Sequence, residues 1–192
     1  MDFFSADKII EPTKGDLLIS EPYLPDPNFE RTVVLLCEHD ENGTLGYVLN
    51  KKSQLTVSDL VEEAEGVDTN VFIGGPVQKD SLHFIHRMPE MANKDKEILP
   101  GVYWDGDFND LLLKINTQQI DTNDVRFFLG YSGWSPGQLM EELAQKSWIV
   151  CKGVGPSIVF DTVPEDMWRT VLKRMGGKFK MIASYPVDPR LN

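Results

Sequence analysis

Cysteine is scarce in this sequence of 192 residues, in which Cys37 and Cys151 are the only two and lie far apart. Such a pair matches neither a disulfide framework nor the spacing of a metal-ligand or redox motif. The chain is also long enough to bury about 70% of its unfolded surface without a covalent staple. We therefore expect two reduced thiols, as in a cytosolic protein, and neither a metal nor a cofactor.

Long hydrophobic runs are missing as well. The longest, Val33 to Cys37, is far shorter than the roughly 20 apolar residues that cross a bilayer. The first residues, Met1 to Ser5, have neither the basic start nor the apolar stretch of a secretory signal. Both absences predict a cytoplasmic protein that has no membrane partner.

Basic residues are few. The sequence has 19 Lys and Arg but 30 Asp and Glu, which gives a net charge of −11. Nucleic-acid binding normally needs a basic surface, since phosphate contacts supply most of the non-specific affinity. One basic stretch, Arg169 to Lys180, contains no acid, but such cations are typical of a helix C-terminus, where they complement the helix dipole. We therefore expect no direct nucleic-acid partner.

Linkers, repeats and low-complexity tracts are also absent, so residues 1–192 are predicted to form one domain. The dipeptide Asn42-Gly43 favours a hairpin between the strands on either side of it. Short apolar and β-branched stretches predict strands at residues 16–20, 32–39, 44–50, 71–73, 82–86, 102–104, 126–130, 148–151 and 157–161.

Helical spacing of apolar residues predicts four helices, at 57–64, at 108–115, from Ser135 onward and at 164–175. Ser135 and Gln138 have the spacing of a capping box. Thr162 and Glu165 are the expected cap partners of the last helix, which Gly176-Gly177 ends. Because hairpin strands alternate with helices, the predicted fold class is α/β of the α+β type, with a mixed, largely antiparallel sheet flanked by about four helices.

Cys37 and His39 are the pair that favours an enzyme. On one regular strand they would project from the same face, about 6–7 Å apart at Cα, and an imidazole beside a thiol activates it as a nucleophile. A hydrolase or transferase using Cys37 and His39 is therefore one hypothesis. Against it, Cys37 closes an apolar run, and buried cysteine usually serves as a small hydrophobic residue.

Three charged residues near that pair in the sequence are candidates for a charged functional site, namely Asp26, Arg31 and Glu38. A structural role is the stronger interpretation. Asp26 precedes Pro27, as in a helix cap or short turn, and Arg31 would pin that turn by pairing with an acid.

Several other motifs lack residues that their function requires. Gly130–Trp134 has Trp134 where a nucleophile elbow needs glycine, and Gly74-Gly75-Pro76 lacks the Lys-Ser/Thr of a phosphate loop. Asp105–Asp110 lacks the glycine of a calcium loop. His83 and His86 are three apart, which puts them on opposite faces of a strand and makes a shared metal site improbable.

Tyr131 and Trp134 mark the place where a ligand is expected. They lie between a predicted strand and a predicted helix, and neighbouring glycines allow close backbone approach. With Gln138 as a polar edge and Gly74-Gly75-Pro76 on the other side, they would form an aromatic-walled pocket. The alternative is that both rings fill the core.

A series of motifs, in order from about residue 15 to 175, resembles the AlgH family, also called YqgE. The matching residues are Gly15-Asp16-Leu17-Leu18-Ile19, Asp26-Pro27-x-Phe29-x-Arg31-Thr32-Val33, Cys37-Glu38-His39, Gly43 to Asn50, Gly74-Gly75-Pro76-Val77, Gly130-Tyr131-Ser132-Gly133-Trp134-Ser135-x-Gly137-Gln138-Leu139 and Phe160-Asp161.

The resemblance implies a bacterial cytosolic protein whose sheet curls into a small barrel-like core. The family is labelled a transcriptional regulator, which leaves its chemistry open. Relatives often have Ala at the position of Ser132, which weakens a nucleophilic role for this residue. Many have an Arg-Gly pair near Ser81-Leu82 that this chain lacks. Three hypotheses follow: a non-enzymatic binding module for an unknown small molecule or protein, the Cys37 enzyme, and a DNA-binding regulator.

The acidic composition generates the first prediction. The purified protein should not bind duplex DNA specifically, because its net charge is −11 and no helix-turn-helix pattern is present. An electrophoretic shift assay at ~150 mM salt measures this. A retarded band that prefers one promoter over scrambled DNA would contradict it.

Overall fold

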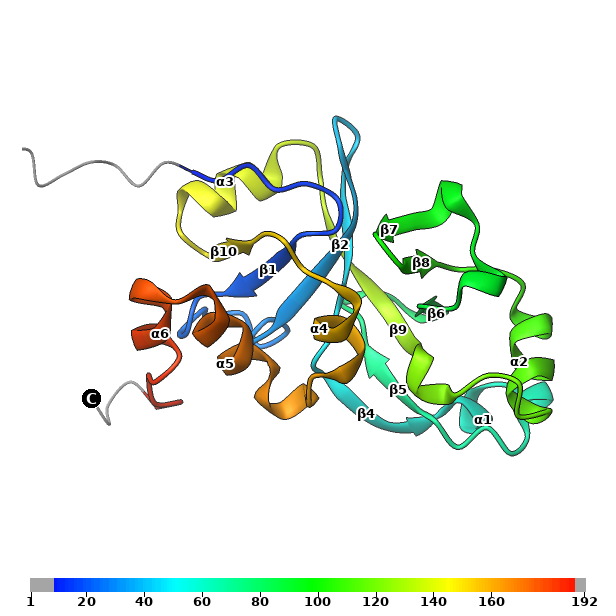
Figure 1. Cartoon of the computed structure of the whole chain (residues 1–192). Coiled ribbons are helices and arrows are strands. Elements are labelled where there is room, and N and C mark those ends of the chain that lie inside the picture. The colour runs from blue at the N-terminus through cyan, green and yellow to red at the C-terminus, as the bar shows by residue number, and fades with distance from the viewer. Residues whose placement is uncertain (1–8, 189–192) are drawn as a thin grey trace, which may run out of the picture.

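A computed structural model describes residues 9–188 and shows strands and helices joined through one long central strand (Figure 1). Residues 1–5, which bear on the secretory-signal prediction, lie outside the described range. The strands are β1 Leu17–Ser20, β2 Val33–Asp40, β3 Gly43–Val48, β4 Lys52–Thr56, β5 Asn70–Ile73, β6 Val77–His86, β7 Glu97–Leu99, β8 Val102–Trp104, β9 Val125–Trp134 and β10 Trp148–Cys151.

These strands form a mixed, largely antiparallel sheet, as predicted. Its main path runs β10-β1-β2-β3-β9-β6-β8-β7, and β4 pairs with β5. The parallel pair is β5 with β9. Because β10 and β7 stand at opposite ends of this path, the sheet is open, and the barrel-like closure that the family resemblance implied is not formed.

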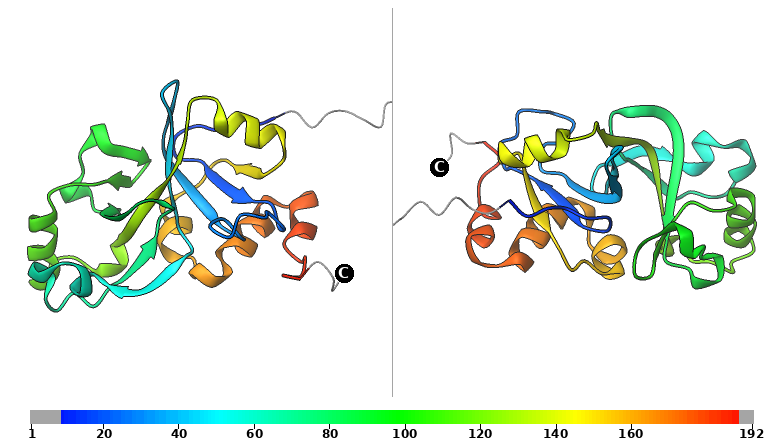
Figure 2. Two further views of the ribbon diagram at one scale, coloured as in Figure 1. Left: turned by 180° about the vertical axis from the view of Figure 1, so that it is seen from behind. Right: turned by 90° about the horizontal axis from the view of Figure 1, so that it is seen from above.

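The central strand, β9, pairs with three others. The end of β9, residues 132–134, pairs with β3, and residues 127–129 pair with β5. β6 occupies the opposite edge from Val125 to Tyr131. β9 therefore joins the part of the molecule that contains β1, β2 and β10 to the part that contains β4 to β8, as Figure 2 shows from two further sides.

The helices cover three clusters of buried apolar side chains. Their bounds are α1 Val57–Leu60, α2 Phe108–Asn116, α3 Gln138–Ala144, α4 Pro156–Asp161, α5 Pro164–Met175 and α6 Gly177–Ile182. α4 and α5 contribute to the first cluster, α1 and α2 to the second, and α3 to the third. Alternate residues of β2 enter the first and third clusters, so this strand is buried on both faces, as its apolar run predicts.

Several local predictions differ from the structure, and three of the differences have a clear physical reason. Residues 157–161 are helical rather than extended, because Pro156 occupies the first helical position and its fixed φ suits a helix start. The third helix begins at Gln138 rather than after Ser135, because Gly137 precedes it with φ 81°. The cap of α5 is Val163 without a side-chain hydrogen bond, so Thr162 and Glu165 are not its cap partners.

Gly74-Gly75-Pro76 carries the chain across β9, from β5 on one edge to β6 on the other. At this crossing the two backbones nearly touch. A Cβ on Gly75 would lie 2.2 Å from the Tyr131 carbonyl, and one on Gly74 would lie 2.4 Å from the Gly130 oxygen. Both glycines are thus required by the backbone path itself.

No helix in the described range is both long enough and apolar enough to span a bilayer.

The crossing generates the second prediction. Gly75→Ala should lower the free energy of unfolding by roughly 3 kcal/mol or more, because the added methyl group meets backbone that cannot move independently. Gly66→Ala is the control, since Gly66 has φ +88° but nothing within 4 Å of the Cβ position, and should cost only about 1–2 kcal/mol. Equal losses in chemical denaturation would contradict the proposed crowding.

Candidate functional site

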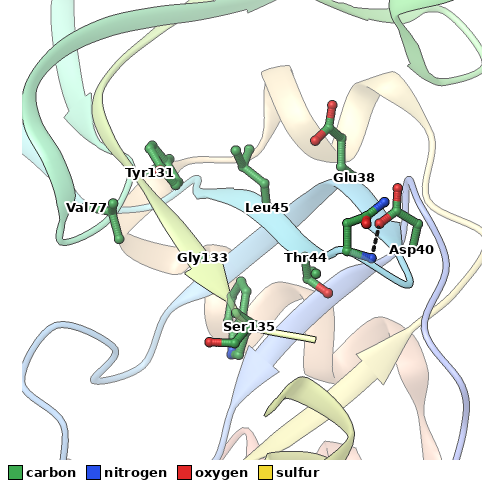
Figure 3. Close-up of a pocket in the computed structure, with 11 residues that line it drawn as sticks. Glu38, Asp40, Thr44, Leu45, Val77, Tyr131, Gly133 and Ser135 are labelled. Atoms are coloured by element: carbon green, nitrogen blue, oxygen red, sulfur yellow. Dashed lines mark hydrogen bonds between the residues drawn. The ribbon is translucent and has the colours of Figure 1, made fainter. Parts of the chain in front are cut away.

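The end of β9 and the residue after it, Tyr131 to Ser135, separate two hollows in the surface. The first, which we call the hairpin groove, has a volume of about 520 Å³ and is drawn in Figure 3. Tyr131 and Val77 lie toward one end of it, Glu38 and Asp40 toward the other, and Leu45 between them. Its lining consists of Glu38, Asp40, Asn42, Gly43, Thr44, Leu45, Val77, Tyr131, Gly133, Trp134 and Ser135.

One wall of the groove is the hairpin of β2 and β3, whose turn the sequence predicts. Asp40 pairs with Gly43 across the turn, and the Asn42 amide donates to Asp40 Oδ1 at 2.7 Å. Gly43 has φ +133°, and a Cβ there would lie 2.6 Å from the Trp134 carbonyl oxygen. The hairpin is therefore held against the end of β9, where Leu45 pairs with Gly133.

A β-bulge in β2 decides how its side chains point. Leu36 pairs with Gly46 but Glu38 pairs with Leu45, which leaves Cys37 as the extra residue. Beyond a bulge the alternation of faces shifts by one residue. His39 accordingly lies opposite Thr44, with its Nδ1 2.6 Å from Thr44 Oγ1.

Cys37 and His39 therefore lie on opposite faces of β2, and the prediction that they share a face is wrong. Cys37 packs in the first core cluster and is 1% exposed. Burial, and secondarily the negative charge of Glu38, raise the pKa of its thiol well above the usual value. A protonated thiol without access to solvent or to an imidazole is a poor nucleophile.

Tyr131 is half-buried and is supported from behind by other aromatic rings. The ring of His83 meets it edge-on at a centroid distance of 6.2 Å and contacts Tyr47 at 5.6 Å. The Trp104 indole in turn donates to the Tyr47 hydroxyl at 2.9 Å. These contacts fix the position of the Tyr131 ring at the groove.

The second hollow, which we call the tryptophan pocket, has a volume of about 390 Å³. Trp134 and Trp148 are both nearly buried, and Phe29 packs on both of them. Glu142 fixes this arrangement, because its carboxylate accepts hydrogen bonds from both indoles, at 2.9 and 2.7 Å, and from the Gln138 amide at 2.9 Å. The lining is Leu24, Asp26, Phe29, Pro76, Gly133, Trp134, Gln138, Glu142, Gln145, Ser147 and Trp148.

The predicted ligand-binding residues are thus divided between the two hollows. Tyr131 lines the hairpin groove, Pro76 and Gln138 line the tryptophan pocket, and Trp134 lines both. Gly74 and Gly75 line neither, since they form the crossing of β9. Gln138 Oε1 accepts from the Ser135 amide at 2.9 Å, so this side chain organises the turn between strand and helix.

The charged candidates have three different roles. Asp26 Oδ1 accepts from the Asn28 amide at 2.9 Å, which closes a turn rather than a helix. Arg31 donates to the backbone oxygens of Tyr185 and Pro186 and stacks 4.6 Å over Trp168. Within residues 9–188 the side chain of Arg31 thus contacts carbonyl oxygens and no carboxylate, in contrast to the expected pairing with an acid. Its backbone has a strained φ of +47°. Glu38 lines the groove.

No three His, Cys, Asp or Glu residues between 9 and 188 are grouped so that they could hold a metal ion. Among the described residues, nothing forms a hydrogen bond with the buried Nε2 of His83 or of His86. Burial lowers the pKa of both imidazoles. Both therefore favour the neutral form and serve as packing groups.

A family model described as AlgH-like matches residues 17–180. The chain belongs to the AlgH-like family. It is 47% identical over 181 residues to a UPF0301 protein of Cytophaga hutchinsonii, covering 94% of this chain and 99% of the relative. It is 39% identical over 178 residues to a UPF0301 protein of Chlorobium luteolum, covering 93% and 94%. The family resemblance seen in the sequence is confirmed.

Two solved structures share the fold. A crystal structure of a Corynebacterium diphtheriae protein aligns with a TM-score of 0.76 at 24% identity, over 95% of this chain and 97% of that one. The solution structure of the AlgH protein from Pseudomonas aeruginosa aligns with a TM-score of 0.69 at 29% identity, over 92% and 97%.

The residues that complete both hollows do not stand out in the sequence. By sequence, Asp40 and Leu45 of the groove belong only to a predicted turn and a predicted strand, because their approach to β9 depends on long-range pairing. Phe29, Glu142 and Trp148 of the pocket come from three separate segments, namely the turn before β2, helix α3 and strand β10. One signal was available: Gln138 and Glu142 are four apart, the spacing at which helical side chains meet.

Burial of Cys37 generates the third prediction. Cys37→Ser should lower the free energy of unfolding by roughly 1–3 kcal/mol, because it buries a hydroxyl group, and Cys37→Ala should cost less. Iodoacetamide should label Cys37 slowly in the folded protein. Cys151→Ala serves as the background for labelling, since Cys151 is the other free thiol. Rapid labelling of Cys37 near neutral pH would revive the enzyme hypothesis.

Proposed function

We propose that this protein is a non-enzymatic binding module whose ligand occupies the hairpin groove, and that any effect on transcription passes through this ligand or a protein partner. The groove's composition carries the proposal. At about 520 Å³ it falls within the 300–1,000 Å³ that ligand sites typically enclose. It combines an aromatic ring, an apolar wall and several polar groups, which is the usual composition of such sites.

The two competing functions have less support. A hydrolase or transferase using Cys37 would need a thiol that reaches both a base and the surface, whereas Cys37 is buried away from His39. A DNA-binding regulator would need a basic surface. The chain has a net charge of −11, and the groove itself carries carboxylates.

The fourth prediction is that a ligand binds in the hairpin groove. A substitution at Gly133 tests it. It lies beside Tyr131 in ordinary strand conformation, and a Cβ there would sit 3.4 Å from the Tyr131 ring. Gly133→Val should therefore fill the groove without straining the backbone. Gly155→Val is the matched control, because nothing lies within 4 Å of its Cβ position and its φ is −114°.

The measurement is the melting temperature and tryptophan fluorescence of wild type and both variants against a panel of cytosolic metabolites. A true ligand should stabilise wild type and Gly155→Val, by about 2.7 kcal/mol at 100 times its Kd, and should have little effect on Gly133→Val. A panel in which no compound shifts either signal, or in which Gly133→Val responds like wild type, would contradict the proposal.

A further inference from the structure

The charged side chains that line the hairpin groove are all carboxylates. They belong to Glu38 and Asp40, and no lysine, arginine or histidine accompanies them in the lining. Within residues 9–188, the Glu38 carboxylate has neither a hydrogen bond nor a salt bridge, and Asp40 accepts from the Asn42 amide. The shape of the surface defines the groove, whatever its charge. The two carboxylates give it a negative electrostatic potential.

The remaining lining suits the rest of a cationic ligand. Leu45 and Val77 provide apolar surface next to the Tyr131 ring (Figure 3). Because Gly133 has no side chain, the space in front of these residues stays open. The apolar stems of lysine-like and arginine-like groups pack well on such surfaces.

We infer that the ligand of the hairpin groove carries an ammonium or guanidinium group on an apolar stem. The cation lies near Glu38 and Asp40, and the stem lies along Leu45, Val77 and Tyr131. This inference rests on the proposed function, because it names the chemical class of the ligand in the same groove. An anionic ligand would instead approach two unneutralised carboxylates and be repelled.

Such a cation can come from a free amine or from a lysine or arginine side chain of a protein. The experiment therefore has two arms, both measured by isothermal titration calorimetry at low and at ~150 mM salt. The free probes are agmatine and spermidine. The peptide probe is acetyl-Leu-Arg-amide, and its neutral counterpart has citrulline in place of arginine. Preference for one arm identifies the source of the cation.

Binding of the cationic probe should weaken up to about fivefold in Glu38→Gln or Asp40→Asn, more in the double variant, and with rising salt. Glu41→Gln is the matched control, since it changes the net charge equally but Glu41 does not line the groove. The citrulline peptide should bind weakly to every variant. Gly133→Val should abolish binding of the cationic probe.

Two outcomes would overturn the inference. One is equal loss of affinity in Glu41→Gln and Glu38→Gln, which would show that only the overall charge matters. The other is preference of the groove for a neutral or anionic compound from the metabolite panel, with Gly133→Val still abolishing its binding. In that case the groove remains a binding site and only the ligand class is wrong, whereas no binding of any compound would contradict the proposed function itself.

Discussion

The passage of Gly74-Gly75-Pro76 across β9 is the constraint on which the surface of this protein depends. Since the two backbones approach so closely that a Cβ on Gly75 would overlap the Tyr131 carbonyl, β5 and β6 are forced onto opposite edges of one strand. The Gly74 oxygen is at the same time bonded to the Val48 amide and the Ser132 hydroxyl, at 2.9 and 3.0 Å. The crossing thereby connects β3 to β9 through hydrogen bonds. As a result, the end of β9 lies between the two hollows.

A single extra residue in β2 determines the chemistry of the groove. Regular alternation would place Glu38 on the face opposite Cys37, and His39 on the same face as the thiol. The bulge at Cys37 reverses this arrangement, because Glu38 now pairs with Leu45 on the groove side while His39 turns to Thr44. The insertion that separates a thiol from an imidazole therefore also delivers a carboxylate to the groove.

The sequence supports the fold class, most of the strands and the hairpin turn, because these follow from local periodicity and from Asn42-Gly43. It could not reveal the bulge, since bulges depend on pairing between strands that one strand's pattern does not contain. Ile158 and Val159 favoured a strand by composition, yet tertiary burial and Pro156 make α4 a helix. The open ends of the sheet are likewise a property of its overall pairing, which no local motif specifies.

In the candidate site, too, some features follow from the local sequence and others only from long-range contacts. Tyr131 and Trp134 stand out in the sequence as aromatic residues between glycines, but their partners arrive from distant segments. The Trp134 indole donates a hydrogen bond to Glu142 of α3, which also accepts one from Trp148. The Tyr131 ring packs against His83 of β6. The strand end can therefore be found in the sequence, and only the tertiary structure shows that it separates two hollows.

The two hollows differ most in what their carboxylates do. The Glu142 carboxylate accepts hydrogen bonds from three N–H donors. These bonds hold the tryptophans in place and already satisfy the carboxylate, so it attracts a ligand only weakly. Glu38 lies on an exposed part of β2 and has no such donors within the described chain. Because a satisfied carboxylate stabilises its surroundings whereas an unsatisfied one attracts a cation, we assign the tryptophan pocket to the support of β9 and propose only the hairpin groove for recognition.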